Sequence, residues 1–365
     1  MCLGASGTGK TYLQEKVSEL IPEEDKIEIT SLSDNAFYYF GRYELQNKLI
    51  LIEDLDGAEN ALYPLRELQS KRRIGKTVTV KDNKGKMKTI NLKVEGPVCV
   101  SSCTTRERIY EDNANRCILL YIDGSSEQDK RIMAYQQAVS SAQINHRNEQ
   151  GIKFKIQNVQ RLLRPIKIVN PYAELIDLPQ QVFKPRRTLL LLLSFIETIT
   201  FYHQYQRKVK TNDMGERYIE TTKGDIEAAF SLMKEVLFSK SDELTKASRN
   251  FLEMLKSTTK KGEVFYANAL RKRLRVPSST LKRYLYELVR NGYVKIKGGS
   301  KYRGFEYEVT DYEEYAQLMS SIDEKLKQIL QKIDRGSGSV AHQWLTNTSE
   351  PLKAKKVNDL DGVAH

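Results

Sequence analysis

The first third of the chain alternates short apolar runs with longer amphipathic stretches. Apolar runs of about four to eight residues between turn residues predict buried strands, and apolar positions recurring every three to four residues predict helices. Because the two kinds of segment alternate, the pattern indicates an α/β fold with a sheet covered by helices. We expect strands at 25–29, 48–52, 98–105 and 118–122, and helices at 12–20, 34–45 and 61–72.

A hairpin with a basic turn is expected before the strand at 98–105. The segments 77–80 and 88–94 alternate apolar and polar residues, which predicts two antiparallel strands. Lys81, Lys84 and Lys86 lie in or beside the turn, where their ammonium groups are suited to grip the phosphate backbone of DNA. A hairpin that is simply solvated is an equal alternative.

The middle of the chain predicts helices joined by an irregular connection. A helix is expected at 130–142, and three prolines between 151 and 179 predict an irregular connector. The apolar stretch from Pro185 predicts a further helix with two arginines in its first turn. Positive charges there oppose the helix dipole and favour an anionic partner, with an exposed basic helix start as the alternative.

The C-terminal third predicts three helices followed by a hairpin, an order typical of a winged helix. Ser278 or Ser279 is expected to cap the third helix. A further helix at 313–333 and a disordered tail to residue 365 are expected to follow. The helices of the module are expected at 248–255, 264–274 and 279–291, and its strands at 292–297 and 305–309.

Positive charge is concentrated in this module. The chain holds 59 Lys and Arg against 47 Asp and Glu, and residues 245–310 alone hold sixteen Lys or Arg against five Glu. Such a segment predicts a polyanion-binding module attached to a nearly neutral remainder. A winged helix used only for protein contacts is the alternative. The expected DNA contacts are Lys282 and Arg283 on the third helix, and Lys301 and Arg303 in the wing.

The overall composition predicts a cytoplasmic protein with no membrane segment. The longest apolar run, 189–196, is far shorter than the roughly 20 residues that span a bilayer. Four cysteines and four histidines lack zinc-type spacing, so we expect the cysteines to be reduced core residues. Only three residues precede the glycine-rich stretch at position 4, fewer than the five or six of a usual strand, which suggests a fragment of a longer protein.

The stretch at 4–11 matches the phosphate-binding pattern G-x-x-x-x-G-K-[ST] at every defined position. Glycine-rich backbone can curl its N–H groups around phosphate oxygens, while the lysine adds positive charge and the last hydroxyl is suited to Mg²⁺. We therefore expect ATP and Mg²⁺ as ligands, with a chance glycine-rich turn as the alternative. The residues are Gly4, Ala5, Ser6, Gly7, Thr8, Gly9, Lys10 and Thr11.

Two acids follow the apolar strand at 48–52, an arrangement typical of a Walker B motif. One of Glu53 and Asp54 would hold the metal and the other would polarise the attacking water; a buried strand with an acidic turn is the alternative. Thr104 ends the next strand, where a sensor of the γ-phosphate would lie. Arg116 precedes another strand, from which it can reach a neighbouring subunit's ATP as an arginine finger.

The order of these motifs resembles the AAA+ motor of the minichromosome maintenance (MCM) replicative helicases. The likeness covers roughly residues 1–200 and the winged helix. Residues 52–56 look like the family's Walker B stretch, and 77–94 look like its DNA-tracking hairpin. Residues 115–117 and 187–189 are similar to its arginine finger and its second sensor.

The resemblance implies a hexameric ring with roles for particular residues. Lys10 and Thr11 would serve the phosphates and Mg²⁺. Glu53 would bind the metal and Asp54 the water. Arg116 and Arg187 would act on nucleotide at the interface between subunits. The acids run Glu-Asp instead of the family's Asp-Glu, and the sensor asparagine is absent, so that Ser102, Cys103 or Thr104 must replace it.

We therefore expect an ATP-dependent DNA helicase or translocase that forms a ring. Comparable motors occur in bacterial mobile elements together with primase-type modules. The alternatives are an ATP-switched DNA-binding or transposition regulator without unwinding activity, and a degenerate ATP-binding scaffold. The expected divisions are an AAA+ core at 1–135, a connector and helical lid at 136–243, a winged helix at 244–312, and a helix with a flexible tail at 313–365.

Overall fold

The computed structural model describes residues 1–55, 61–81, 85–106, 116–144, 147–274, 276–300 and 303–336. Its N-terminal part is a five-stranded sheet in the order β2-β3-β6-β1-β7, in which every adjacent pair is parallel. The parallel α/β fold is therefore confirmed. The strands are β1 (Cys2–Leu3), β2 (Lys26–Ile29), β3 (Lys48–Ile52), β6 (Val98–Thr104) and β7 (Leu120–Tyr121).

Among the described residues between these strands there are two α-helices and two 3₁₀ turns. They are α1 (Lys10–Ser18), α2 (Leu62–Lys71), η1 (Glu23–Asp25) and η2 (Ala36–Tyr38). The helix expected at 34–45 is wrong, because only η2 is helical there. Gly41 interrupts the segment, and its N–H bonds to the Glu44 carboxylate at 2.7 Å, which closes a turn. Phe37 and Leu45 are fully buried on either side of that turn.

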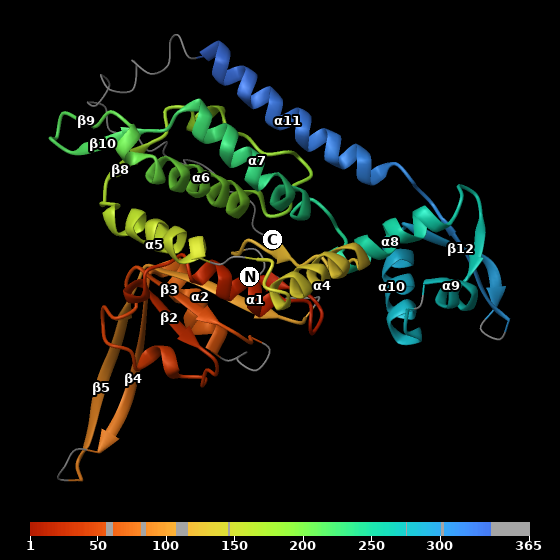
Figure 1. Cartoon of the computed structure of the whole chain (residues 1–365), viewed down its shortest axis with the longest axis horizontal. Coiled ribbons are helices and arrows are strands. Elements are labelled where there is room, and N and C mark those ends of the chain that lie inside the picture. Colours follow the sequence, from red (N-terminus) through yellow and green to blue (C-terminus); the bar gives the residue numbers. More distant parts are fainter. Residues whose placement is uncertain are drawn as a thin grey trace, which may run out of the picture.

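The hairpin is longer than the sequence pattern indicated. Strands β4 (Arg73–Lys81) and β5 (Met87–Glu95) pair through nine consecutive antiparallel positions, from Arg73 opposite Glu95 to Lys81 opposite Met87. Ile74 and Val94 at its root are buried in the same core as Ile50. The rest of the ribbon projects away from the parallel sheet (Figure 1).

The connector expected to be irregular at 151–179 is partly helical. Helices α4 (Ser126–Ser140) and α5 (Arg147–Leu162) are followed by β8 (Lys167–Val169) and η4 (Ala173–Leu175). The prolines begin at Pro165, after the end of α5, so none of them interrupts the helix. Gln157 and Gln160 donate to backbone carbonyls just after α1, with Gln160 Nε2 2.7 Å from the Leu20 oxygen. These bonds hold α5 against the parallel-sheet part.

Three long helices share one apolar core. Helix α6 (Pro185–Tyr202) packs on α7 (Lys223–Ser239), and α11 (Glu314–Gly336) runs back along α7 from the C-terminal side (Figure 1). Leu192, Met233 and Ile329 from the three helices are all buried in this core. Between α6 and α7 the chain forms η5 (Gln204–Gln206), β9 (Lys210–Thr211) and β10 (Arg217–Glu220), with a three-stranded sheet in the order β8-β10-β9.

The C-terminal module contains three helices and a three-stranded sheet in the order β11-β13-β12. Its elements are α8 (Lys246–Thr258), β11 (Val264–Tyr266), α9 (Ala267–Leu274), α10 (Ser278–Arg290), β12 (Val294–Ser300) and β13 (Gly304–Val309). The helix expected from 264 is wrong for its first three residues, because they pair with β13 and bury Phe265. The expected serine cap is also wrong: Pro277 is the N-cap residue, and no side chain caps α10.

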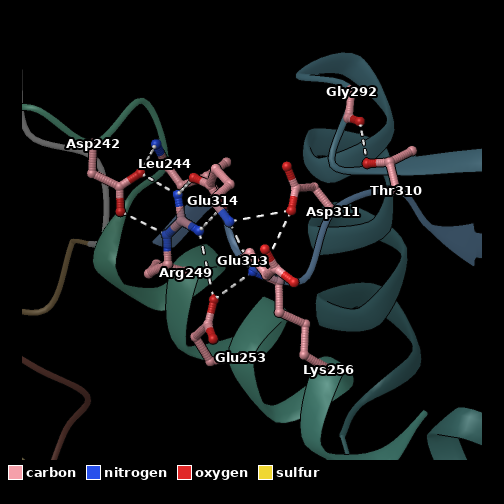
Figure 2. A network of polar contacts seen from close by, with 10 residues as sticks. All are labelled: Asp242, Leu244, Arg249, Glu253, Lys256, Gly292, Thr310, Asp311, Glu313 and Glu314. Carbon is pink, nitrogen blue, oxygen red and sulfur yellow. Dashed lines mark hydrogen bonds and ion pairs between the residues drawn. The ribbon is translucent and has the colours of Figure 1, made fainter. Parts of the chain in front are cut away.

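A buried charge network joins this module to the three-helix core (Figure 2). The Arg249 side chain is 1% exposed and forms ion pairs with Asp242 at 2.6 Å and Glu314 at 2.8 Å. The rings of Tyr293 and Tyr315 lie 5.1 Å from the guanidinium carbon. Arg249 therefore connects the start of α8 to the start of α11.

The cysteines are all free, as expected, but their burial differs. Cys2 and Cys103 are buried, whereas Cys99 is exposed, so the expectation of core positions is wrong for Cys99. Cys99 and Cys103 both lie on β6, and only the carboxyl end of that strand is enclosed. Among the described helices, none is both long and apolar enough to cross a bilayer. The tail at 337–365 lies outside the described residues.

Candidate nucleotide site

The loop between β1 and α1 requires glycine at three positions. Gly7 and Gly9 have φ of +79° and +89°, a backbone region that residues with a side chain rarely adopt. A Cβ on Gly4 would lie 2.7 Å from Thr8 Oγ1, which is too close for a real contact. The sequence therefore folds here into a loop whose backbone is open to a ligand, with the N-terminus of α1 directly behind it.

Lys10 is held within this loop. Its side-chain Nζ donates to the carbonyl oxygens of Gly4 at 2.8 Å and Ala5 at 2.7 Å. Thr8 Oγ1 donates to the same Ala5 oxygen at 2.9 Å. Lys10 is 9% exposed, so its positive charge is fixed beside the loop and not free in solvent.

An open cavity of about 410 Å³ lies at the carboxyl ends of β1, β3 and β6. Parallel strands bring the residues that follow them to one edge of a sheet, which explains why segments distant in sequence meet here. Glu53 and Asp54 enter the cavity after β3, and Thr104 enters from the end of β6. From the loop and helix α1 come Ser6, Gly7, Gly9, Lys10, Thr11 and Tyr12.

Gln14, which the sequence reasoning missed, links α1 to the strands β3 and β6 behind the cavity. Its Nε2 donates to the Ile52 oxygen at 3.4 Å, and Cys103 Sγ donates to its Oε1 at 3.0 Å. The side chain is buried, on the same helix face as Lys10 and Ser18. The available signal was a glutamine four residues after the P-loop lysine, because that spacing returns to the same face of a helix.

The thiols of Cys2 and Cys103 interact behind the cavity. The two residues are register partners on β1 and β6. Their hydrogen bond lowers the pKa of Cys2 to about 6 against the opposing effect of burial, and the same bond with burial raises the pKa of Cys103. Both thiols are buried, so these shifts do not make them accessible.

The structure does not bring the two expected arginines into the cavity. Arg116 lies before β7 and donates to the Ser70 hydroxyl on α2, and it is not among the residues lining the cavity. Arg187 is exposed in the first turn of α6 and also does not line it. Thr104 does line the cavity, and its hydroxyl accepts from the Arg106 N–H at 3.1 Å.

The expected DNA-binding residues that the structure describes are all exposed. Lys81 and Lys86 lie near the end of the hairpin. Lys282 and Arg283 lie on α10, and Arg303 lies in the turn between β12 and β13. Lys84 and Lys301 lie outside the described residues, as do positions 56 and 115 of the motifs that resemble the MCM family.

Comparison with known families supports the reading of the loop. Residues 1–162 match a family model described as the MTBMA_p00010 P-loop domain. No curated protein matches the chain. The matched span runs from β1 through the last residue of α5. The chain thus carries a nucleotide-binding P-loop domain of the NTPase type.

Proposed function

We propose that this chain is an AAA+ ATPase that unwinds DNA or moves along it. One observation carries the proposal: the P-loop, two carboxylates and a strand-end threonine line one cavity, while a long basic hairpin projects from the same domain. A nucleotide site beside an extended cationic element is the arrangement that an ATP-driven DNA motor needs.

The residues in the cavity fit a nucleoside triphosphate with Mg²⁺. Lys10 would exchange its bonds to the loop carbonyls for bonds to phosphate oxygens, and the backbone N–H groups of the loop would bind further phosphate oxygens. Thr11, Glu53 and Asp54 offer the oxygen donors that Mg²⁺ prefers. Within the described residues, no cluster of three His, Cys, Asp or Glu offers another metal site. Magnesium would supply positive charge to the phosphates, and Asp54 or Glu53 would orient the water.

Strand order supports a sensor role for Thr104. β6 lies between β1 and β3, so Thr104, its last residue, lies between the phosphate loop after β1 and the two acids after β3. Its hydroxyl could replace the missing sensor asparagine. Arg116 and Arg187 lie outside the cavity of their own chain, and we assign them to the nucleotide of a neighbouring subunit in a ring, most simply a hexamer.

Two surfaces are proposed to bind DNA. The hairpin end carries Lys81 and Lys86, and we propose that Lys84 contributes between them. The C-terminal module, read as a winged helix, presents Lys282 and Arg283 on α10 with Arg303 in the wing. Helices α6 and α7, joined by α11, are proposed to form the lid. A cytoplasmic role in replicating a mobile element, alongside a primase-type module, completes the proposal.

The test is ATP hydrolysis with and without single-stranded DNA, followed by strand displacement. We expect DNA to stimulate turnover and Lys10→Ala to abolish it. Equal mixtures of wild type and Arg116→Ala should be less active than the mean of the two, because neighbours would complete each other's sites. Simple averaging would refute the ring. Stimulated turnover without displacement or translocation would favour an ATP-switched regulator, and no turnover would favour a scaffold.

A further inference from the structure

A second cavity, of about 480 Å³, lies at the root of the hairpin, away from the P-loop. It is open to solvent and lined by residues of η2, α2, the first residues of β4 and the last of β5. None of its lining residues is shared with the nucleotide cavity. Its volume falls within the range of small-ligand pockets, roughly 300–1,000 Å³.

Two tyrosines give this root cavity aromatic surface. Tyr63 on α2 is 55% exposed, and the guanidinium of Arg66 lies 5.7 Å from its ring centre. Tyr38 on η2 is half-buried, with the Lys76 ammonium 5.4 Å from its ring. Burial raises the pKa of Tyr38, and the nearby Tyr63 adds to that effect. The two rings therefore line one space.

Positive charge predominates around these rings. Four cationic and two acidic side chains line the cavity, and one acid, Glu95, is paired with Arg42 at 2.6 Å. The other, Glu67, is paired with Lys71 at 2.5 Å. Among the described residues, Arg73 and Lys93 have no carboxylate within ion-pair distance. The cavity therefore offers two cations to an anionic ligand.

One face of the hairpin carries two of the cavity's cations and continues to the tip. Successive residues of a strand point to opposite faces, and register partners share a face. Arg73, Lys93 and Lys81 therefore lie on one side, with Lys93 opposite Gly75 and Lys81 opposite Met87. Thr77 Oγ1 donates to Asn91 Oδ1 at 2.7 Å on that side, which confirms the alternation. The eight steps from Arg73 to Lys81 span about 26 Å at roughly 3.3 Å per residue.

We propose that the root cavity binds one nucleotide of a single-stranded nucleic acid, with the base against Tyr63 and Tyr38 and the strand continuing along the polar face of the hairpin. Base faces are covered in a duplex, so an aromatic cavity of this size selects an unpaired base. Arg73 and Lys93 meet the phosphates. This assignment rests on the proposed DNA-handling function and adds a binding site to it.

The test measures anisotropy of a labelled oligothymidylate on the full chain without ATP. Tyr63→Ala should weaken binding about fivefold or more, because stacking on one aromatic ring is typically worth that much, while Tyr63→Phe should retain affinity. Arg73→Gln and Lys93→Gln should each lower the slope of log affinity against log salt by about 0.7. Tyr39→Ala is the matched control, since Tyr39 is 65% exposed but does not line the cavity.

The outcomes separate this site from the wider proposal. Oligothymidylate binding that is unchanged by Tyr63→Ala would overturn the root site alone. Equal losses for Tyr63→Ala and Tyr39→Ala would do the same. If thymidine monophosphate displaced the labelled oligomer as well as unlabelled oligomer does, the site would be one for free nucleotide, and strand binding would be overturned. No binding of the oligomer by the wild type would overturn the DNA function together with this site.

Discussion

Arg249 should be among the most sensitive positions of the chain for stability. Its side chain is 1% exposed, and its Nε and Nη2 donate to the two Asp242 carboxylate oxygens at 2.7 and 2.6 Å. Two further bonds reach Glu314 at 3.0 and 2.8 Å (Figure 2). Asp242 is only 5% exposed, so Arg249→Ala would leave a buried carboxylate without its partner. Breaking such a pair typically costs about 3–5 kcal/mol.

The matched control is an exposed pair of the same chemistry. Arg161 and Glu24 form an ion pair at 2.7 Å, with side chains 36% and 55% exposed. Because solvent screens this pair, Arg161→Ala should lower stability far less than Arg249→Ala does. The free energies of unfolding would be compared by urea denaturation followed by circular dichroism.

A third variant tests the reason for the loss. Arg249→Met combined with Asp242→Asn and Glu314→Gln removes the charges together, and should recover much of the stability lost in Arg249→Ala. If Arg249→Ala and Arg161→Ala lowered stability equally, burial of the network would not be what makes it important. If the neutral triple variant were no better than Arg249→Ala, the uncompensated carboxylate would not be the cause.

Three further predictions concern pH, the nucleotide site and backbone strain. Burial opposes ionisation of Asp225, but bonds from Thr222, His203 and Arg207 outweigh burial and lower the pKa of this carboxyl. Its contribution to stability should therefore be full above its unfolded pKa of about 3.9 and should be lost as the pH falls further. The difference in urea stability between wild type and Asp225→Asn should shrink at low pH, and a constant difference would contradict this. Gln14→Leu should lower ATP turnover, because the substitution removes both side-chain bonds that join α1 to β3 and β6. The circular dichroism spectrum should stay unchanged. Unchanged turnover would show that these bonds do not position the site. Gly9→Ala should cost about 1 kcal/mol of stability and weaken nucleotide binding, because the φ angle of Gly9 is +89°. Gly151→Ala in α5 has open space around it and should stabilise the chain by about 0.4–1 kcal/mol. Stability would be measured by calorimetry and binding by nucleotide titration, and equal effects of the two substitutions would show that backbone strain at Gly9 is unimportant.

Local sequence was sufficient for features that depend on neighbouring residues. The strand β3 was predicted with its observed bounds, and the glycines at 7 and 9 have the positive φ values that a phosphate loop needs. The hairpin and α10 were also located, because period-two and period-four patterns directly reflect which face of an element is buried. The prolines after residue 164 led to a wrong prediction of irregular structure at 151–162, which is helical, because a proline restricts only the residues beside it.

Tertiary structure decided which distant surfaces meet. Nothing near α11 in the sequence shows that Ile329 packs against Leu192 and Met233. The count of basic residues likewise does not reveal that Arg249 is buried among carboxylates, while Lys282 remains exposed. The bonds of Gln14 to β3 and β6, and the root cavity, emerge only when strands and helices are placed together. Local periodicity tells which face of an element is apolar, but the free energy of burial depends on the surface that covers it, and that surface comes from elsewhere in the chain.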